Sequence, residues 1–207
     1  MDADTVFAAS AAGRRALADL LDTLDEGQLA TPSLCGLWDV RTVAAHLCAA
    51  VTPSPVGFVL ALLKSGGRPH RANDAYARTV AQRPFPELVQ QLRQHAGSRF
   101  SPPVVGPRGP LTDVLVHTGD ITVPLGLAYD PPAGHVRIAL DFVTAGRPIG
   151  FVPRGRLAGL ELVADDLGWS WGSGPRVSGR GVDLLMAACG RSALVPALTG
   201  PGVARWG

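Results

Sequence analysis

Lysine is almost absent from this chain of 207 residues, in which Lys64 is the only lysine among 19 lysine and arginine residues. The formal net charge is only +2 at pH 7, and arginine supplies almost all of the positive charge. A block of basic residues with interleaved aromatic residues, the sequence pattern of many nucleic-acid-binding surfaces, does not occur. The sequence therefore gives no indication of a nucleic-acid partner.

Cysteine is scarce as well. Cys35, Cys48 and Cys189 are widely spaced, include no Cys-x-x-Cys pair and are odd in number, which argues against a disulfide framework. The most apolar run, residues 56–63, is far too short to cross a bilayer. No secretory signal follows the acidic start of the chain. These absences predict a reduced, cytoplasmic protein without a membrane partner.

Apolar residues, in contrast, are plentiful and recur mostly at helical spacing. They make up 46% of the chain, which is enough for one domain and a small second one. Leu17, Leu20 and Leu21 illustrate the helical spacing, whereas apolar residues near the carboxyl terminus favour short strands. We predict helices at residues 4–25, 40–51, 56–64, 75–82, 87–97, 111–121 and 135–145, then strands at 157–163, 168–172 and 176–179, then helical segments at 182–188 and 192–198.

Glycine, proline and polar residues predict where these elements begin and end. Gly27 is expected to end the first helix, and Asp39 is a plausible N-cap of the second. Pro124 lacks an N–H group and should end or kink the helix that precedes it. Residues 66–74 predict a polar loop, and residues 130–134 a linker.

One predicted helix carries three side chains that can bind a metal. At about 100° per residue, Asp113, His117 and Asp120 fall within roughly 60° of one another. They lie in the middle of the apolar arc of the helix, where a core-facing helix usually carries Leu or Val. Burial of such groups without partners is costly. Either a metal ion or a hydrogen-bonded His–Asp network would remove that cost.

His46 offers a third ligand from the preceding helix. It lies at the edge of an apolar face formed by Val43, Leu47 and their neighbours, and a lone histidine there usually belongs to the core. Combined with Asp113 and His117, however, it completes two imidazoles and one carboxylate, a familiar donor set for zinc with an open coordination position. Cys48 points to another face of the helix. Cys35 could approach the site, but no adjacent base favours a catalytic thiolate.

Three segments resemble one known family. Residues 33–47, SLCGLWDVRTVAAHL, resemble the SLCPGWxVRDVxAHL segment of the mycothiol-dependent maleylpyruvate isomerase family. Asp113-x-x-x-His117-x-x-Asp120 resembles its second metal motif, Glu-x-x-x-His-x-x-Asp, with Asp113 one methylene shorter than the family's Glu. Residues 168–191 resemble its small carboxy-terminal domain. The three motifs occur in the family's order and span almost the whole chain.

The resemblance implies a fold and a division into domains. It implies an α+β chain in which residues 1–130 form a DinB-like metal-binding four-helix bundle and residues 135–207 form a small α/β domain. The near absence of lysine, with much Ala, Gly and Pro, is typical of a GC-rich genome and fits actinobacteria, the bacteria that make mycothiol. The sequence leaves the choice between a monomer and a homodimer open.

The resemblance also implies two cofactors and their ligands. A divalent metal, zinc above all, would be held by His46, Asp113 and His117, with mycothiol bound at its open position. Asp120 would accept a hydrogen bond from a ligating histidine and fix its tautomer, or would replace Asp113 as the ligand.

Four further residues receive roles from the resemblance. Trp38, Arg71 and Asn73 would lie near the thiol cofactor. Trp38 could instead be a packing anchor at the start of a helix, and Arg71 part of a solvated loop. Arg191 would hold a carboxylate of the substrate, or would form a salt bridge at the surface or between the domains.

The function implied is the activation of a thiol cofactor. A metal-bound thiolate would add to a small-molecule electrophile, which leads to cis–trans isomerisation or to S-transfer. One alternative is a non-catalytic helical bundle that binds or regulates and retains a vestigial metal site. Another is a hydrolase that uses zinc-bound water, although no clear general base supports it.

Overall fold

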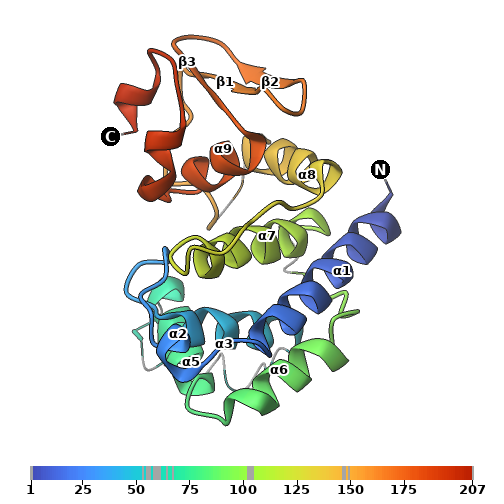
Figure 1. Ribbon diagram of the computed structural model, residues 1–207. Helices are drawn as coiled ribbons and strands as arrows, with labels where there is room; N and C mark the ends of the chain where they lie inside the picture. Colours follow the sequence, from blue (N-terminus) through green and yellow to red (C-terminus); the bar gives the residue numbers. More distant parts are fainter. Residues whose placement is uncertain are drawn as a thin grey trace.

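Four helices close a bundle in the amino-terminal part of the chain. The computed structural model describes residues 2–52, 54, 57, 62, 63, 65, 66, 68–101, 105–145, 148 and 150–206. α1 (Ala3–Leu21) and α3 (Val40–Val51) each pack against both α6 (Phe85–Gln94) and α7 (Arg108–Thr122), as Figure 1 shows. α5 (Pro69–Val80) and the one-turn α2 (Glu26–Leu29) pack against α3. The predicted four-helix bundle is confirmed.

Local sequence signals explain how α3 presents its apolar face. Asp39 has an extended backbone, and its Oδ1 accepts a hydrogen bond from Thr42 N at 2.7 Å, so Asp39 is the N-cap, as predicted. Val40, Val43 and Leu47 are almost fully buried. Each such side chain contributes about 1.5–3 kcal/mol by leaving water. This packing fixes the face of α3 that carries His46.

α7 lies between the other bundle helices and the carboxy-terminal part of the chain (Figure 1). It packs against α1 and α3 on one side and against α8 (Ala133–Thr144) and α9 (Gly181–Ala188) on the other. Most of its side chains are therefore buried. It ends at Thr122, before Pro124, as the sequence predicts.

A small three-stranded sheet packs with α9 at the end of the chain (Figure 1). Its strand order is β2 (Trp169–Gly172), β1 (Glu161–Ala164), β3 (Arg176–Gly179); β1 pairs antiparallel with β2 and parallel with β3. The predicted hairpin and third strand are confirmed. Trp169 Nε1 donates to Asp141 Oδ1 of α8 at 2.8 Å and so ties the sheet to α8.

Several predicted boundaries are wrong. The first helix ends at Leu21, and Gly27 does not end it but lies within α2, because Asp25 caps a new helical turn through a capping box with Gln28. α5 begins at Pro69, inside the predicted polar loop, since proline fits the first helical position.

One other boundary also differs from the prediction. α8 begins at Ala133, inside the predicted linker. The segment Ser192–Ala197 (η1) is a 3₁₀ helix, as is Val203–Arg205 (η2). Most of the helix predicted at 56–64 lies outside the described residues. The division into domains at residues 130–135 stays a prediction, since α8 packs against both α7 and α9.

None of the helices in the described part of the chain combines the length and the hydropathy needed to cross a bilayer.

Arg14 joins α1 to the segment after α6 from a buried position. It is 4% exposed, and its Nη1 donates to Ala96 O at 2.9 Å and to Ser98 O at 2.8 Å. Arg14→Met would remove a charged donor from these carbonyls, one of which belongs to a buried residue. We expect a loss of about 1.5–3 kcal/mol in the free energy of unfolding, measured by urea titration.

Arg15 is the matched control, because it follows Arg14 in the same helix and is exposed. Arg15→Met should change the free energy of unfolding by less than about 0.5 kcal/mol. Equal losses in the two variants would contradict the anchoring role of Arg14.

Candidate metal centre

Two histidines and one carboxylate converge where α3 faces α7. His46 Nε2 lies 3.6 Å and His117 Nε2 lies 3.5 Å from the same oxygen, Asp113 Oδ1. Both distances exceed the usual range of hydrogen bonds. Two ligands of a tetrahedral zinc with bonds of 2.0–2.1 Å lie about 3.4 Å apart. The separations therefore fit a metal donor set better than a hydrogen-bonded network, and the residues fit a divalent metal.

The charges of this group are strongly coupled. Burial favours the neutral form of Asp113, but the two imidazoles beside it, those of His117 and His46, outweigh it and lower the pKa of the carboxyl. Burial likewise opposes protonation of His117, but Asp113 and Asp120 outweigh it and raise the pKa of the imidazole well above its usual value. A partner of opposite charge thus decides each shift: the imidazoles lower the pKa of Asp113, and the carboxylates raise the pKa of His117.

Asp120 lies behind His117 and is fully buried. Its Oδ2 lies 2.9 Å from His117 Nδ1, and both of its oxygens accept hydrogen bonds from Arg191, at 2.8 Å from Nε and at 2.6 Å from Nη2. Burial would raise the pKa of Asp120, but Arg191 and His117 lower it. An ionised carboxylate only accepts, so His117 Nδ1 carries a proton, and Nε2 is the nitrogen that a metal would bind in place of a proton.

A glycine turn directs Arg191 from the end of α9 toward α7. Gly190 has φ +91°, a backbone region that favours glycine, and Arg191 N–H donates to Met186 O at 3.0 Å. Arg191 Nη1 also donates to Cys189 O at 2.8 Å. The salt bridge that the sequence offered as one role of Arg191 is therefore present, and it joins residues 71 positions apart in the chain.

Trp38 forms a wall beside the two histidines. Its ring centroid lies 5.3 Å from that of His46 and 6.3 Å from that of His117. Its Nε1 donates to Asp74 Oδ1 of α5 at 2.6 Å, and Arg78 Nε donates to the same oxygen at 3.0 Å. At 8% exposure Trp38 is both a packing anchor and part of the site.

The site opens into a cavity of about 540 Å³. The cavity is lined by Trp38, Asn73 and Arg191 together with the three residues of the donor set. Arg71, predicted near the thiol cofactor, is exposed and does not line it. Asp74, the neighbour of Asn73, also lines the cavity, and so does Arg78, which sequence reasoning missed and which donates to Asp74. The i, i+4 spacing of Asp74 and Arg78 is the sequence signal for this ion pair, but residues up to 74 are predicted to form a loop, in which such a spacing carries no meaning.

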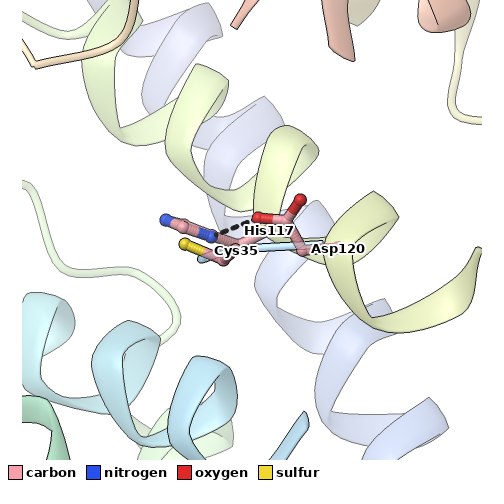
Figure 2. Close-up of side chains that lie close together, drawn as sticks. All are labelled: Cys35, His117 and Asp120. Atoms are coloured by element: carbon pink, nitrogen blue, oxygen red, sulfur yellow. Dashed lines mark hydrogen bonds and ion pairs between the residues drawn. The ribbon is translucent and has the colours of Figure 1, made fainter. Parts of the chain in front are cut away.

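Cys35 is a further wall residue. The loop before α3 brings its half-buried side chain next to the ring of His117 (Figure 2). Cys48, in contrast, is fully buried, as expected of a residue that is not a ligand, and its Sγ donates to Leu88 O at 2.9 Å. Each of the three cysteines is a free thiol.

Comparison with known proteins assigns the family. The family model described as "Mycothiol maleylpyruvate isomerase N-terminal domain" matches residues 10–122, more than half of the chain. The chain belongs to this family. The matched region contains all three residues of the donor set and Asp120, whereas Arg191 lies beyond it. A comparison with curated protein sequences gave no match.

Two solved structures share the fold over almost the whole chain. The crystal structure of the mycothiol-dependent maleylpyruvate isomerase has a TM-score of 0.65 and 14% sequence identity, and the match covers 97% of this chain and 93% of that one. A histidine-to-alanine mutant of that isomerase gives a TM-score of 0.63 with the same identity and coverage. The predicted fold of bundle followed by a small carboxy-terminal unit is confirmed.

Metal binding can be tested with single histidine variants. We expect about one zinc per chain in the wild-type protein after zinc loading and dialysis, measured by elemental analysis. His46→Ala and His117→Ala each remove one of three ligands and should retain almost none. His95→Ala is the matched control, because His95 is exposed and lies at the end of α6. Equal zinc in all four proteins would contradict the site.

The Arg191–Asp120 pair can be tested by its stability contribution. Arg191→Met would leave a fully buried carboxylate with only His117 as its charged partner, and we expect a loss of about 3–5 kcal/mol in the free energy of unfolding. Arg180→Met is the control: Arg180 pairs with Asp130 at an exposed position, where such pairs contribute at most about 1 kcal/mol. Similar losses in the two variants, measured by urea titration, would contradict the buried role of Arg191.

Proposed function

We propose that this protein is a metal-dependent enzyme that uses mycothiol as its thiol cofactor and acts on a small electrophilic molecule. The reaction is a cis–trans isomerisation or an S-transfer, since both begin with addition of a thiolate to carbon. When bound, zinc supplies a thiolate at neutral pH because it favours the deprotonated form of a sulfur ligand.

One observation carries this proposal. The Nε2 atoms of His46 and His117 point at the same oxygen of Asp113, at 3.6 and 3.5 Å, on the wall of a cavity. Three protein ligands with an accessible fourth position are typical of catalytic zinc, whereas structural zinc is enclosed by four. The shorter Asp113, in place of the family's Glu, still places its oxygen within reach of both imidazoles.

The chain's own residues orient the donor set. Asp120 holds the proton on His117 Nδ1, so that Nε2 is available to the metal. Arg191 keeps Asp120 ionised and in place through two hydrogen bonds. Trp38 covers the imidazoles on one side and excludes water there.

The position of Arg191 favours a substrate that carries a carboxylate. A guanidinium has five N–H donors on three nitrogens. Asp120 accepts a hydrogen bond from Nε and one from Nη2, and Cys189 O accepts one from Nη1. Each of the two terminal nitrogens thus has a second N–H. Because Arg191 lines the cavity, these groups can hold a carboxylate of the substrate next to the metal.

The test is turnover with and without the thiol. The zinc-loaded protein should convert maleylpyruvate, or conjugate an alkyl halide, only when mycothiol is added. His117→Ala should reduce the rate to that of the uncatalysed reaction, and His95→Ala should leave it unchanged. Both reactions should be followed with the same protein preparation, since the proposal allows either.

Two results would contradict the proposal. Hydrolysis of esters or amides without thiol would favour a hydrolase that uses metal-bound water. A folded protein that binds no zinc and shows no thiol-dependent turnover would favour a non-catalytic bundle, in which Asp113, His46 and His117 form only a buried polar network.

A further inference from the structure

The loop between α2 and α3 places a thiol on the wall of the metal cavity. Cys35 lies beside the imidazole ring of His117, as Figure 2 shows. The ligand atoms of Cys35, His117 and Asp120 lie within 4.8 Å of one another, and so do those of His46, Asp113 and His117. His117 therefore belongs to two groups of possible metal ligands.

Backbone hydrogen bonds hold the loop in this position. Leu34 N–H donates to Asp120 O at 3.2 Å, and Cys35 N–H donates to Ser33 Oγ at 3.0 Å. Gly36 follows with φ +60°, a turn conformation that favours glycine. The hydrogen bond from Leu34 thus fixes the Cys35 loop to the part of α7 that carries His117.

Asp120 is not available as a ligand of a separate metal. Both of its oxygens accept hydrogen bonds from Arg191, and Oδ2 also accepts one from His117 Nδ1. A metal bound there would have to displace the guanidinium and remain next to its positive charge. Of the two groups, only the one that contains His46 has a carboxylate free to bind a metal. Cys35 is left to add to that group.

We propose that Cys35 Sγ is the fourth ligand of this metal in the resting protein and that an incoming thiol takes its place. This inference rests on the proposed function, because it needs the metal. Zinc is commonly bound by four nitrogen and sulfur ligands in a tetrahedron, and the His46–Asp113–His117 set leaves one position open. The four residues do not form a single group within 4.8 Å, so Sγ moves toward the metal when it binds.

The exchange balances without a separate base. The bond between the metal and Cys35 Sγ breaks, a bond between the metal and the incoming sulfur forms, and the proton of the incoming thiol passes to Cys35. One thiolate replaces another, so the charge of the site does not change. Cys35 would therefore receive the proton that a catalytic base would otherwise have to accept.

Two other cysteines provide matched controls. Burial raises the pKa of both Cys48 and Cys189 to about 12. Cys189 lines the same cavity as Cys35 but belongs to neither group of ligands. If Cys189 supplied the sulfur ligand, the Cys189 variant would lose it and the Cys35 variant would keep it; if either thiol could supply it, both variants would keep it.

Cobalt provides a direct probe, because a thiolate bound to Co²⁺ gives a charge-transfer band in the near ultraviolet that nitrogen and oxygen ligands do not give. Metal-free protein without added thiol is titrated with Co²⁺, and bound cobalt is measured by equilibrium dialysis. We expect the band in the wild-type protein, in Cys48→Ser and in Cys189→Ser, and its complete loss in Cys35→Ser, which should still bind cobalt and show the visible bands of the other ligands.

The outcomes separate this inference from the proposed function. Bound cobalt without the charge-transfer band in the wild type, or with the band retained in Cys35→Ser, overturns the role of Cys35 and leaves the metal site intact. Absence of cobalt binding in the wild type overturns the proposed function and this inference with it.

The exchange itself is tested in the wild-type protein, which avoids any effect of a variant on folding. Iodoacetamide is added to the zinc-loaded protein, and alkylation of Cys35 is measured by peptide mass spectrometry. Iodoacetamide is kept in excess over 2-mercaptoethanol, because the small thiol also consumes the reagent. We expect zinc to protect Cys35 from alkylation and added 2-mercaptoethanol to abolish this protection. Protection that persists with the thiol, or no protection by zinc, would contradict the exchange.

Discussion

The buried contact between Asp120 and Arg191 determines how the rest of the site is arranged. Asp120 is fully buried on α7, and Arg191 reaches it from the turn after α9 with two short hydrogen bonds. Removal of either charge would leave the other buried without its main partner. The pair also sets the protonation of His117, because an ionised Asp120 requires a proton on Nδ1. The arrangement of the candidate metal centre therefore depends on a contact between the bundle and the carboxy-terminal unit.

The packing of α7 on both sides brings these partners together. The bundle helices α1 and α3 cover one side and bring His46 to Asp113, while α8 and α9 cover the other and bring Arg191 to Asp120. The bundle helices alone would supply His46, Asp113 and His117, but Asp120, the partner of His117 Nδ1, would lack Arg191. The carboxy-terminal unit thus contributes to the candidate metal site through the hydrogen bonds that orient His117 by way of Asp120. In known metal sites, loss of such a partner commonly costs roughly 10- to 100-fold in metal affinity.

Much of this arrangement could be predicted from local sequence. The Asp113, His117 and Asp120 spacing placed three polar groups on one helical face, and Asp39 marked the start of α3 through capping chemistry. The role of Asp120 could not be decided, since its bond to Arg191 spans 71 residues and no periodicity reports such a contact. Arg78 could not be placed at the site, because its link to Trp38 passes through Asp74 and joins two segments of the chain that no periodicity connects. The sequence predicts that Cys35 could approach the site, but its position beside His117 depends on the backbone hydrogen bond between Leu34 and Asp120.

The most direct test of this account is anomalous diffraction at the zinc edge from crystals of the zinc-loaded protein. The account expects one anomalous peak, at bonding distance from the Nε2 atoms of His46 and His117 and from an oxygen of Asp113. Asp120 should remain bonded to Arg191 and to His117 Nδ1. A peak bound to Asp120 in place of Arg191, or the lack of any peak between the two histidines, would contradict the central claim that these three residues form the metal centre.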